Sequence, residues 1–214
     1  MPMLNPSRRT LSLGAVALTL AASCPVVARE AVAPGQPAPD FTARDTAGRE
    51  VRLSSFKGKV VVLEWTNHDC PYVKKHYGTG NMQALQKEAT AQGVVWLTIS
   101  SSAAGSQGHV NGLEAEKLTS DRKAVPTAFL LDHDGRVGRL YGASATPHMY
   151  VIDKAGLLAY IGAIDDKPST NRDDVPLARN YVREALAAVQ SGQAVKTAST
   201  RVYGCTIKYP DPRS

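Results

Sequence analysis

The sequence is poor in cysteine and in aromatic residues, with three cysteines and 6% aromatics among 214 residues. So few cysteines exclude a disulfide-rich scaffold. Long basic runs are also missing, although the net charge is +6. Nucleic acid is therefore not an expected partner, because phosphate binding needs clustered Lys and Arg side chains.

What is present is typical of a globular protein. Apolar residues make up 43% of the chain and charged residues 21%. These proportions argue against disorder and against a polytopic membrane protein. The length is enough for one domain with a substantial core.

The N-terminus has the pattern of an export signal. Arg8 and Arg9 precede a twelve-residue apolar run, Leu11–Ala22, which is too short to span a bilayer. The small residues of Val26–Ala28 then offer a cleavage point. We predict a signal peptide over residues 1–28 and a periplasmic or secreted protein. The paired arginines also suit a twin-arginine signal, so both export routes remain open.

Cleavage after Ala28 would remove Cys24. A lipoprotein signal usually has leucine three residues before its cysteine, and Ala21 holds that place, so no membrane anchor is expected after cleavage. The mature chain then keeps Cys70 and Cys205, which are able to pair in an oxidising compartment.

Two almost uniformly apolar runs, Val60–Trp65 and Val94–Ile99, predict strands buried on both faces. Between them, Met82, Leu85 and Ala89 fall on one face at helical spacing. Two buried strands joined by a helix indicate a βαβ unit with parallel strands.

The rest of the chain predicts a loop, short helix, strand, hairpin and terminal helix. The expected elements are a loop over Ser100–Gly112, a helix over Leu113–Leu118, a strand over Ala128–Leu131, a hairpin of Met149–Ile152 and Leu157–Ile161, and a helix capped by Asp174 with Pro176 in its first turn and ended by Gly192. We therefore predict an α/β domain over residues 34–192, with a central mixed β-sheet flanked by helices. A polar tail over residues 193–214 carries Cys205, and its aromatic and β-branched residues predict a docked, ordered segment.

Cys70 directly follows the first buried strand, and Pro71 suits the first position of a helix. Cys70 would then be the N-cap, where backbone N–H groups and the helix dipole favour a thiolate. Lys74 and Lys75 follow one turn later and add positive potential. The alternative is an inert buried cysteine at a strand end.

The segments Val60–Trp65 and Asn67–Val73, with Ala38–Phe41 and Thr146–His148, resemble the thioredoxin-like redoxins. The nearest group is the alkyl hydroperoxide reductase and thiol-specific antioxidant family. The resemblance implies a thioredoxin-like fold over Pro34–Gln190, a cis peptide bond before Pro147, and substrate contact at Thr146 and Pro147. It implies a thiol or disulfide protein, or a peroxide, as substrate, an external thiol as reductant, and no cofactor.

The chain departs from this family at several positions. Val73 stands where a dithiol site has its second cysteine, and Asn67 stands where peroxiredoxins have threonine. Lys74 occupies the second cysteine place of the copper-delivery relatives. Cys205 is therefore the one intramolecular partner left for Cys70. We expect it to resolve the reaction, with a structural disulfide or an idle thiol as alternatives.

Four residues near Cys70 are expected to tune its thiol: Asn67, His68, Pro71 and Lys74. No metal is expected, although Cys70 with His68 and His148 is the one set we consider. The indoles of Trp65 and Trp96 are assigned to the core, with a redox role for Trp65 as the alternative. Glu64 is expected at an edge or strand end facing water, the alternative being a buried acid that assists proton transfer.

Together these features predict an exported thiol oxidoreductase in which Cys70 attacks a disulfide or a peroxide. Cys205 or an external thiol then resolves the product. The alternative, from another functional class, is a non-catalytic thioredoxin-fold module that binds a peptide or a metal ion.

Overall fold

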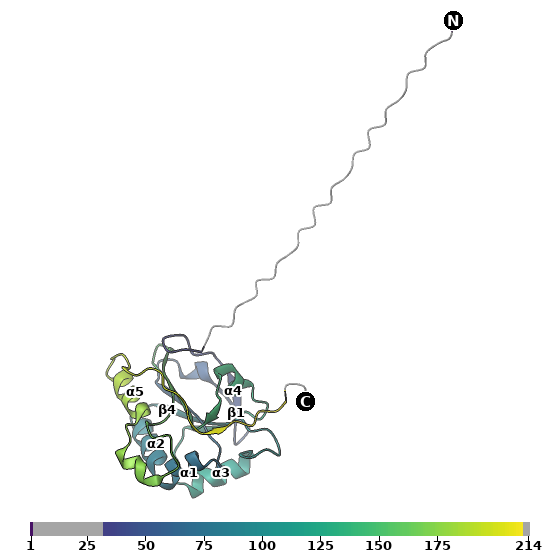
Figure 1. Ribbon diagram of the computed structural model, residues 1–214. Coiled ribbons are helices and arrows are strands. Elements are labelled where there is room, and N and C mark those ends of the chain that lie inside the picture. Colours follow the sequence, from purple (N-terminus) through teal and green to yellow (C-terminus); the bar gives the residue numbers. More distant parts are fainter. Residues whose placement is uncertain (2–31, 212–214) are drawn as a thin grey trace.

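The computed structural model describes Met1 and residues 32–211 (Figure 1). Residues 2–31 contain almost all of the predicted signal peptide and Cys24, so those predictions lie outside the described residues. A seven-stranded mixed sheet, in the order β2-β1-β5-β4-β3-β7-β8, forms the centre. Its strands are β1 (Thr42–Asp45), β2 (Glu50–Arg52), β3 (Val61–Trp65), β4 (Val95–Ser100), β5 (Ala128–Leu131), β7 (His148–Ile152) and β8 (Leu158–Gly162).

The helices are α1 (Pro71–Gly78), α2 (Asn81–Ala91), α3 (Gly112–Asp121), α4 (Arg136–Tyr141) and α5 (Tyr181–Gln190). Two 3₁₀ helices, η1 (Leu53–Phe56) and η2 (Arg172–Leu177), lie in connections. A separate two-stranded sheet pairs β6 (Ala145–Thr146) with β9 (Cys205–Thr206). None of the helices in residues 32–211 has both the length and the apolar composition needed to cross a bilayer.

The predicted βαβ unit is confirmed at the centre of the sheet. β3 and β4 run parallel, and every residue of both strands is buried. The connection contains two helices rather than one, because Gly80 takes a positive φ of 77° between them. On its other side β3 pairs antiparallel with β7, which forms the predicted hairpin with β8. The carboxyl end of β3 therefore lies in the middle of the sheet, where α1 begins.

Helices and loops cover both faces of the sheet (Figure 1). The sheet therefore separates the hydrophobic core into two clusters, one on each face. On one face α1, α2 and α5 pack against side chains such as Val62, Trp96 and Val151. On the other face α4 and the segment around Phe41 pack against side chains such as Leu63 and Trp65. Trp65 and Trp96 are fully buried, as expected of core residues.

The predicted start of the last helix is wrong. Asp174 and Pro176 lie in η2, and α5 begins at Tyr181 behind Asn180, whose side chain accepts a hydrogen bond from the Arg183 backbone. Leu177, which the predicted helix would include, is 74% exposed. The helix α4 was not anticipated, because only six residues separate Gly135 from Gly142 and such a short segment shows no clear periodicity.

The tail after α5 is docked on the domain, as predicted. It runs in an extended conformation across the front of the molecule to the side opposite α5 (Figure 1). From Cys205 to Lys208 its side chains alternate between buried or partly buried and exposed, which is the two-residue period of a strand. Tyr203 and Cys205 pack against the α1 side of the core. Ile207 and Tyr209 pack against the α4 side. The tail therefore bridges the two layers.

Candidate active site

Cys70 occupies the predicted N-cap of α1, with Pro71 in the first turn. Its backbone is extended, at φ −65° and ψ 124°, so the helix begins directly after it. The residue is 0% exposed. Its sulfur donates a hydrogen bond to the carbonyl oxygen of Thr146, at 3.1 Å. The helix start and Thr146, 76 positions apart in the chain, thus meet at the thiol.

The peptide bond between Thr146 and Pro147 is cis, as the family resemblance implied. The strand β6 ends at this bond and pairs antiparallel with β9 of the tail. In this register Ala145 lies opposite Thr206, and Thr146 lies opposite Cys205. The pairing explains how the tail cysteine reaches Cys70: the same Thr146 faces both cysteines.

Cys205 is partly buried, and both cysteines are free thiols. Burial raises the pKa of the Cys205 thiol to about 12, with further upward contributions from a hydrogen bond to Cys70 and from its charge. The side chain of Lys208 opposes this rise in pKa. At neutral pH the Cys205 thiol is therefore protonated. It lies beside Cys70 although the two cysteines are 135 residues apart in the sequence.

The residues expected to tune the thiol organise the loop before α1. Asn67 is buried, and its Oδ1 accepts a hydrogen bond from the Asp69 backbone N–H at 2.8 Å. The His68 ring lies 3.3 Å from the Asp69 carboxylate, and the Lys74 ammonium lies 3.7 Å from it. Both side chains thus contact one carboxylate in the loop and first turn that carry Cys70.

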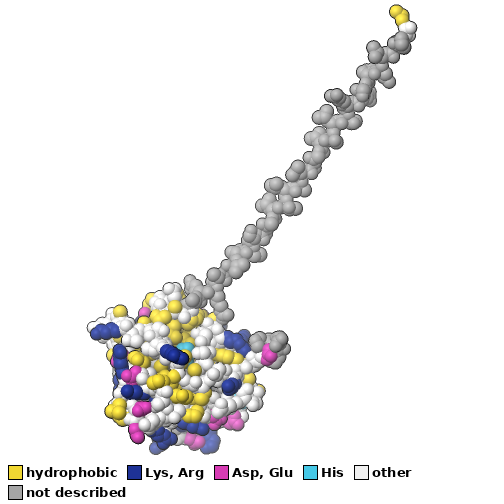
Figure 2. Space-filling view, viewed as in Figure 1, with side chains coloured by type: hydrophobic (Ala, Val, Ile, Leu, Met, Phe, Trp, Pro, Cys, Tyr) yellow, Lys and Arg dark blue, Asp and Glu magenta, His cyan; other side chains and the backbone are white. Residues whose placement is uncertain are grey.

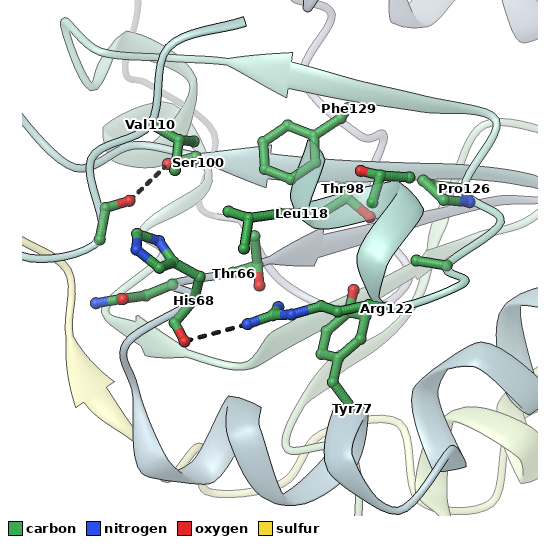
Figure 3. A pocket seen from close by; sticks show the side chains of 14 residues that line it. Thr66, His68, Tyr77, Thr98, Ser100, Val110, Leu118, Arg122, Pro126 and Phe129 are labelled. Carbon is green, nitrogen blue, oxygen red and sulfur yellow. Dashed lines mark hydrogen bonds between the residues drawn. The ribbon is translucent and has the colours of Figure 1, made fainter. Parts of the chain in front are cut away.

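His68 also borders a small pocket behind this loop (Figure 3). Arg122 lies below the pocket and donates a hydrogen bond to the His68 carbonyl at 3.1 Å. The cavity measures about 20 Å³, enough for roughly one water molecule. His68 therefore contributes its backbone to holding the loop, and its ring faces Ser100 and Val110.

The expectation that Glu64 faces water is wrong, because its side chain is fully buried in β3. Its two carboxyl oxygens accept hydrogen bonds from four side chains: Tyr77 (2.8 Å), Trp96 (2.8 Å), Gln86 (3.1 Å) and Thr98 (3.1 Å). Burial raises the pKa of the Glu64 carboxyl, and these donors oppose the rise. The signal for burial in the sequence was the position of Glu64 inside an apolar run. A carboxyl group in a buried strand needs hydrogen-bond partners, because burying it without them is costly.

A second buried polar cluster holds the tail, and sequence reasoning did not anticipate it. Lys75 is buried, and its ammonium donates to the Lys167 carbonyl at 2.8 Å and lies 3.8 Å from Asp165. The Tyr203 hydroxyl donates to the Asp165 carboxylate and lies 3.2 Å from the His76 ring. We call Lys75, His76, Asp165 and Tyr203 the tail latch.

The latch uses a neutral histidine. Burial, followed by the charge of Lys75, lowers the pKa of His76 to about 3. The Asn81 amide contacts the other ring nitrogen at 2.9 Å. Because Lys75 turns into this cluster, its ammonium lies beside the Asp165 carboxylate and 5.4 Å from the centroid of the Tyr203 ring.

The histidine set considered for a metal does not assemble. In residues 32–211 no group of three or more His, Cys, Asp and Glu side chains is arranged to hold an ion. His148 is buried and its ring packs on Tyr150, with centroids 4.6 Å apart. Burial lowers the pKa of His148 to about 4.

Comparison with known proteins identifies the family of the chain. Residues 34–161 match the AhpC/TSA family. The thiol-disulfide oxidoreductase ResA of Geobacillus thermodenitrificans is 28% identical over 135 residues, which cover 60% of this chain and 68% of that protein. ResA of Bacillus subtilis is 27% identical over 134 residues, covering 56% and 74%.

Solved structures share the fold. An uncharacterised conserved protein from Geobacillus kaustophilus has a TM-score of 0.73 at 24% identity, covering 86% of this chain and 95% of that chain. A hypothetical protein from Sinorhizobium meliloti has a TM-score of 0.69 at 24% identity, covering 85% and 97%. The chain thus belongs to the AhpC/TSA family and is a thiol-dependent oxidoreductase with a thioredoxin-like fold.

Proposed function

We propose that this protein exchanges thiols and disulfides through Cys70 and Cys205, with Cys70 as nucleophile and Cys205 as resolving thiol. The observation that carries the proposal is the strand register that sets Cys205 opposite Thr146, whose carbonyl accepts the Cys70 hydrogen bond. A resolving thiol must reach the sulfur of the mixed disulfide, and this pairing brings it there without rearrangement of the core.

The reaction runs in two exchanges. The Cys70 thiolate attacks one sulfur of a substrate disulfide, forms a mixed disulfide, and releases the other sulfur as a thiolate that takes up a proton. Cys205 then loses its proton and attacks the Cys70 sulfur. This forms the Cys70–Cys205 disulfide and releases the second substrate thiol, so two electrons pass to the substrate. An external thiol reductant returns the pair to the dithiol state.

The environments of the two thiols support this order. Cys70 stands at the N-cap of an eight-residue helix, where the positive end of the helix dipole favours negative charge; its sulfur caps no helix N–H and donates to the Thr146 carbonyl. The pKa of Cys205, about 12, keeps that thiol protonated until the mixed disulfide has formed beside it. Asn67, His68, Pro71 and Lys74 act in this proposal by fixing the loop and helix start that carry Cys70.

A disulfide is the favoured substrate over a peroxide. Asn67 stands in the position of the peroxiredoxin threonine, and its amide oxygen is engaged with the backbone of Asp69. The ResA relatives are named as thiol-disulfide oxidoreductases. We place the protein in the periplasm or outside the cell, where its substrates would be thiol or disulfide proteins, because the first 28 residues have the pattern of an export signal.

The test compares single cysteine variants of the mature chain with a disulfide substrate and with hydrogen peroxide. Cys70→Ser should abolish turnover, and Cys205→Ser should accumulate a mixed disulfide through Cys70, seen by mass spectrometry. The oxidised wild type should yield a peptide that joins the two cysteines. If both variants turn over substrate like the wild type, the pair is structural and the proposed cysteine roles are refuted. If the wild type itself turns over neither substrate, the chain is a binding module.

Faster turnover of peroxide than of the disulfide would reassign the substrate while keeping the two cysteine roles. Two free thiols after mild oxidation would refute the resolving role of Cys205. Slow alkylation of Cys70 in a variant with the tail released, at a rate set by an ordinary thiol pKa near 8.5, would refute its role as nucleophile.

A further inference from the structure

The edge of β6 lies beside the catalytic thiol, and the tail already occupies it. β9 pairs with β6 in antiparallel register, and the Ile207 N–H donates to the Ser144 carbonyl at 3.2 Å. Antiparallel strand addition of this kind is a general way for a sheet edge to bind an extended peptide. The chain therefore supplies its own strand at the place where the family resemblance puts substrate contact.

Gly204 makes this pairing possible. Its φ is +138°, and a Cβ atom there would lie 2.0 Å from the Thr146 carbonyl oxygen. Since that is far inside van der Waals contact with backbone, any other residue would push the tail away from β6. The close approach is thus built into the tail immediately before Cys205.

The tail is also anchored on both sides of β9. Tyr203 enters the tail latch, and Ile207 is buried on the α4 side. Further along, the Ala103 N–H donates to the Lys208 carbonyl at 2.8 Å, and the Tyr209 hydroxyl donates to the Ala143 carbonyl at 2.7 Å. These contacts on both sides of β9 stabilise the pairing of this two-residue strand with β6.

The docked tail leaves the Cys70 sulfur without access from solvent. Cys70 is 0% exposed, whereas Cys205 in the tail is partly exposed. The face over which the tail runs shows hydrophobic side chains in its middle and most of its charged groups toward the outline (Figure 2). A second strand cannot pair with this edge of β6 while the tail is there.

We propose that residues 203–209 are a tethered occupant of the substrate edge, and that an extended polypeptide disulfide reaches Cys70 by replacing β9 in the same antiparallel register. This inference rests on the proposed function. It makes the tail a determinant of specificity as well as the carrier of Cys205. A small disulfide needs only an opening over the sulfur, whereas a polypeptide needs the whole edge of β6.

The test measures formation of the mixed disulfide at Cys70 in Cys205→Ser and in Cys205→Ser with Gly204→Ala. The polypeptide probe is the tail sequence 201–209, with its cysteine joined to 2-nitro-5-thiobenzoate. The small probe is cysteine joined to the same leaving group. Each reaction releases the coloured thiolate, so both rates are read from one absorbance.

Both rates should rise when Gly204→Ala loosens the tail, and the ratio of peptide rate to small-probe rate should rise about tenfold, which corresponds to ~1.4 kcal/mol of added edge pairing. A peptide N-methylated at the residue matching Ile207 lacks the N–H that Ser144 accepts, and should lose that gain. Ile207→Ala in the Cys205→Ser background is a second way to loosen the tail, and should move the ratio in the same direction.

Equal acceleration of both probes would show that the tail only covers the thiol, and would overturn the proposal. The same tenfold gain with the N-methylated peptide would overturn it as well, because edge pairing would then not contribute. No mixed disulfide with either probe in any variant would instead refute the proposed function, so the two failures are distinguishable.

Discussion

Removing one hydroxyl from the tail latch should unmask Cys70. In Tyr203→Phe the ring stays, together with its contact to Tyr72 at 5.5 Å, and only the hydroxyl between Asp165 and His76 is lost. The side chains of Asp165 and His76 are 2% and 0% exposed. Each would be left short of one hydrogen-bond partner away from water.

Leaving a buried polar group unsatisfied costs about 1–3 kcal/mol. If the docked tail loses that much relative to the released tail, the open fraction rises about 5- to 150-fold. Cys70 is 0% exposed under the tail, so its alkylation must pass through the open form. Its rate should rise by the same factor. The Asp165 carboxylate retains the Lys167 N–H at 3.0 Å, which favours the lower half of the range.

The assay is alkylation of the reduced protein by iodoacetamide, followed by trypsin and mass spectrometry. Cys70 and Cys205 fall in different tryptic peptides, since Arg and Lys residues separate them, so each rate is read independently. Tyr72→Phe is the matched control because it removes a hydroxyl from the neighbouring ring outside the latch. Its effect should stay near twofold, the size of an ordinary surface change of ~0.5 kcal/mol.

The reasoning fails if Tyr203→Phe accelerates Cys70 no more than Tyr72→Phe does. It also fails if alkylation of Cys70 in the wild type follows global unfolding in urea, because the tail would then have no opening of its own.

Two further predictions concern buried titratable groups, both followed by urea unfolding as a function of pH. Glu64 has a raised folded pKa, so its contribution to stability is complete below its ordinary value of 4.5 and is lost as pH rises through the folded value. The wild type should therefore lose stability relative to Glu64→Gln between pH 4.5 and pH 8; a constant difference would contradict this. His148 has a folded pKa of about 4, so the neutral ring stabilises the fold above pH 6.5 and the benefit is lost as pH falls toward 4. Between pH 6.5 and pH 4.5 the wild type should lose up to ~2.7 kcal/mol more than His148→Gln, and parallel curves would rule out the buried ring as the cause.

Much of the fold follows from local pattern. The apolar runs of β3 and β4 and the spacing of Met82, Leu85 and Ala89 suffice for the βαβ unit, because burial on two faces leaves a distinct sequence signal. The start of α5 was misplaced because η2 also carries an Asx-type cap and a proline, and local capping chemistry does not distinguish a 3₁₀ turn from an α-helix.

The site was predicted only in part, for a different reason. The position of Cys70 depends on its immediate neighbours, which the sequence displays. The position of Cys205 depends on a strand pair formed with β6, some 60 residues earlier, and no local rule specifies such a pair. Glu64 and the tail latch are likewise satisfied by partners on other elements, so a charged residue in an apolar run was ambiguous until those partners were placed.

The two-residue alternation of the tail fixes the position of Cys205 relative to Cys70. Every second residue of the tail packs on the core: Tyr203, Cys205, Ile207 and Tyr209. The anchors on either side of Cys205 therefore determine which way its side chain faces. Deleting Gly204 would put Cys205 out of step with Tyr203, and deleting Thr206 would put it out of step with Ile207, although the cysteine itself would remain in the tail. Chains of this kind are therefore better compared by the parity of their tail spacing than by the presence of a cysteine near the C-terminus.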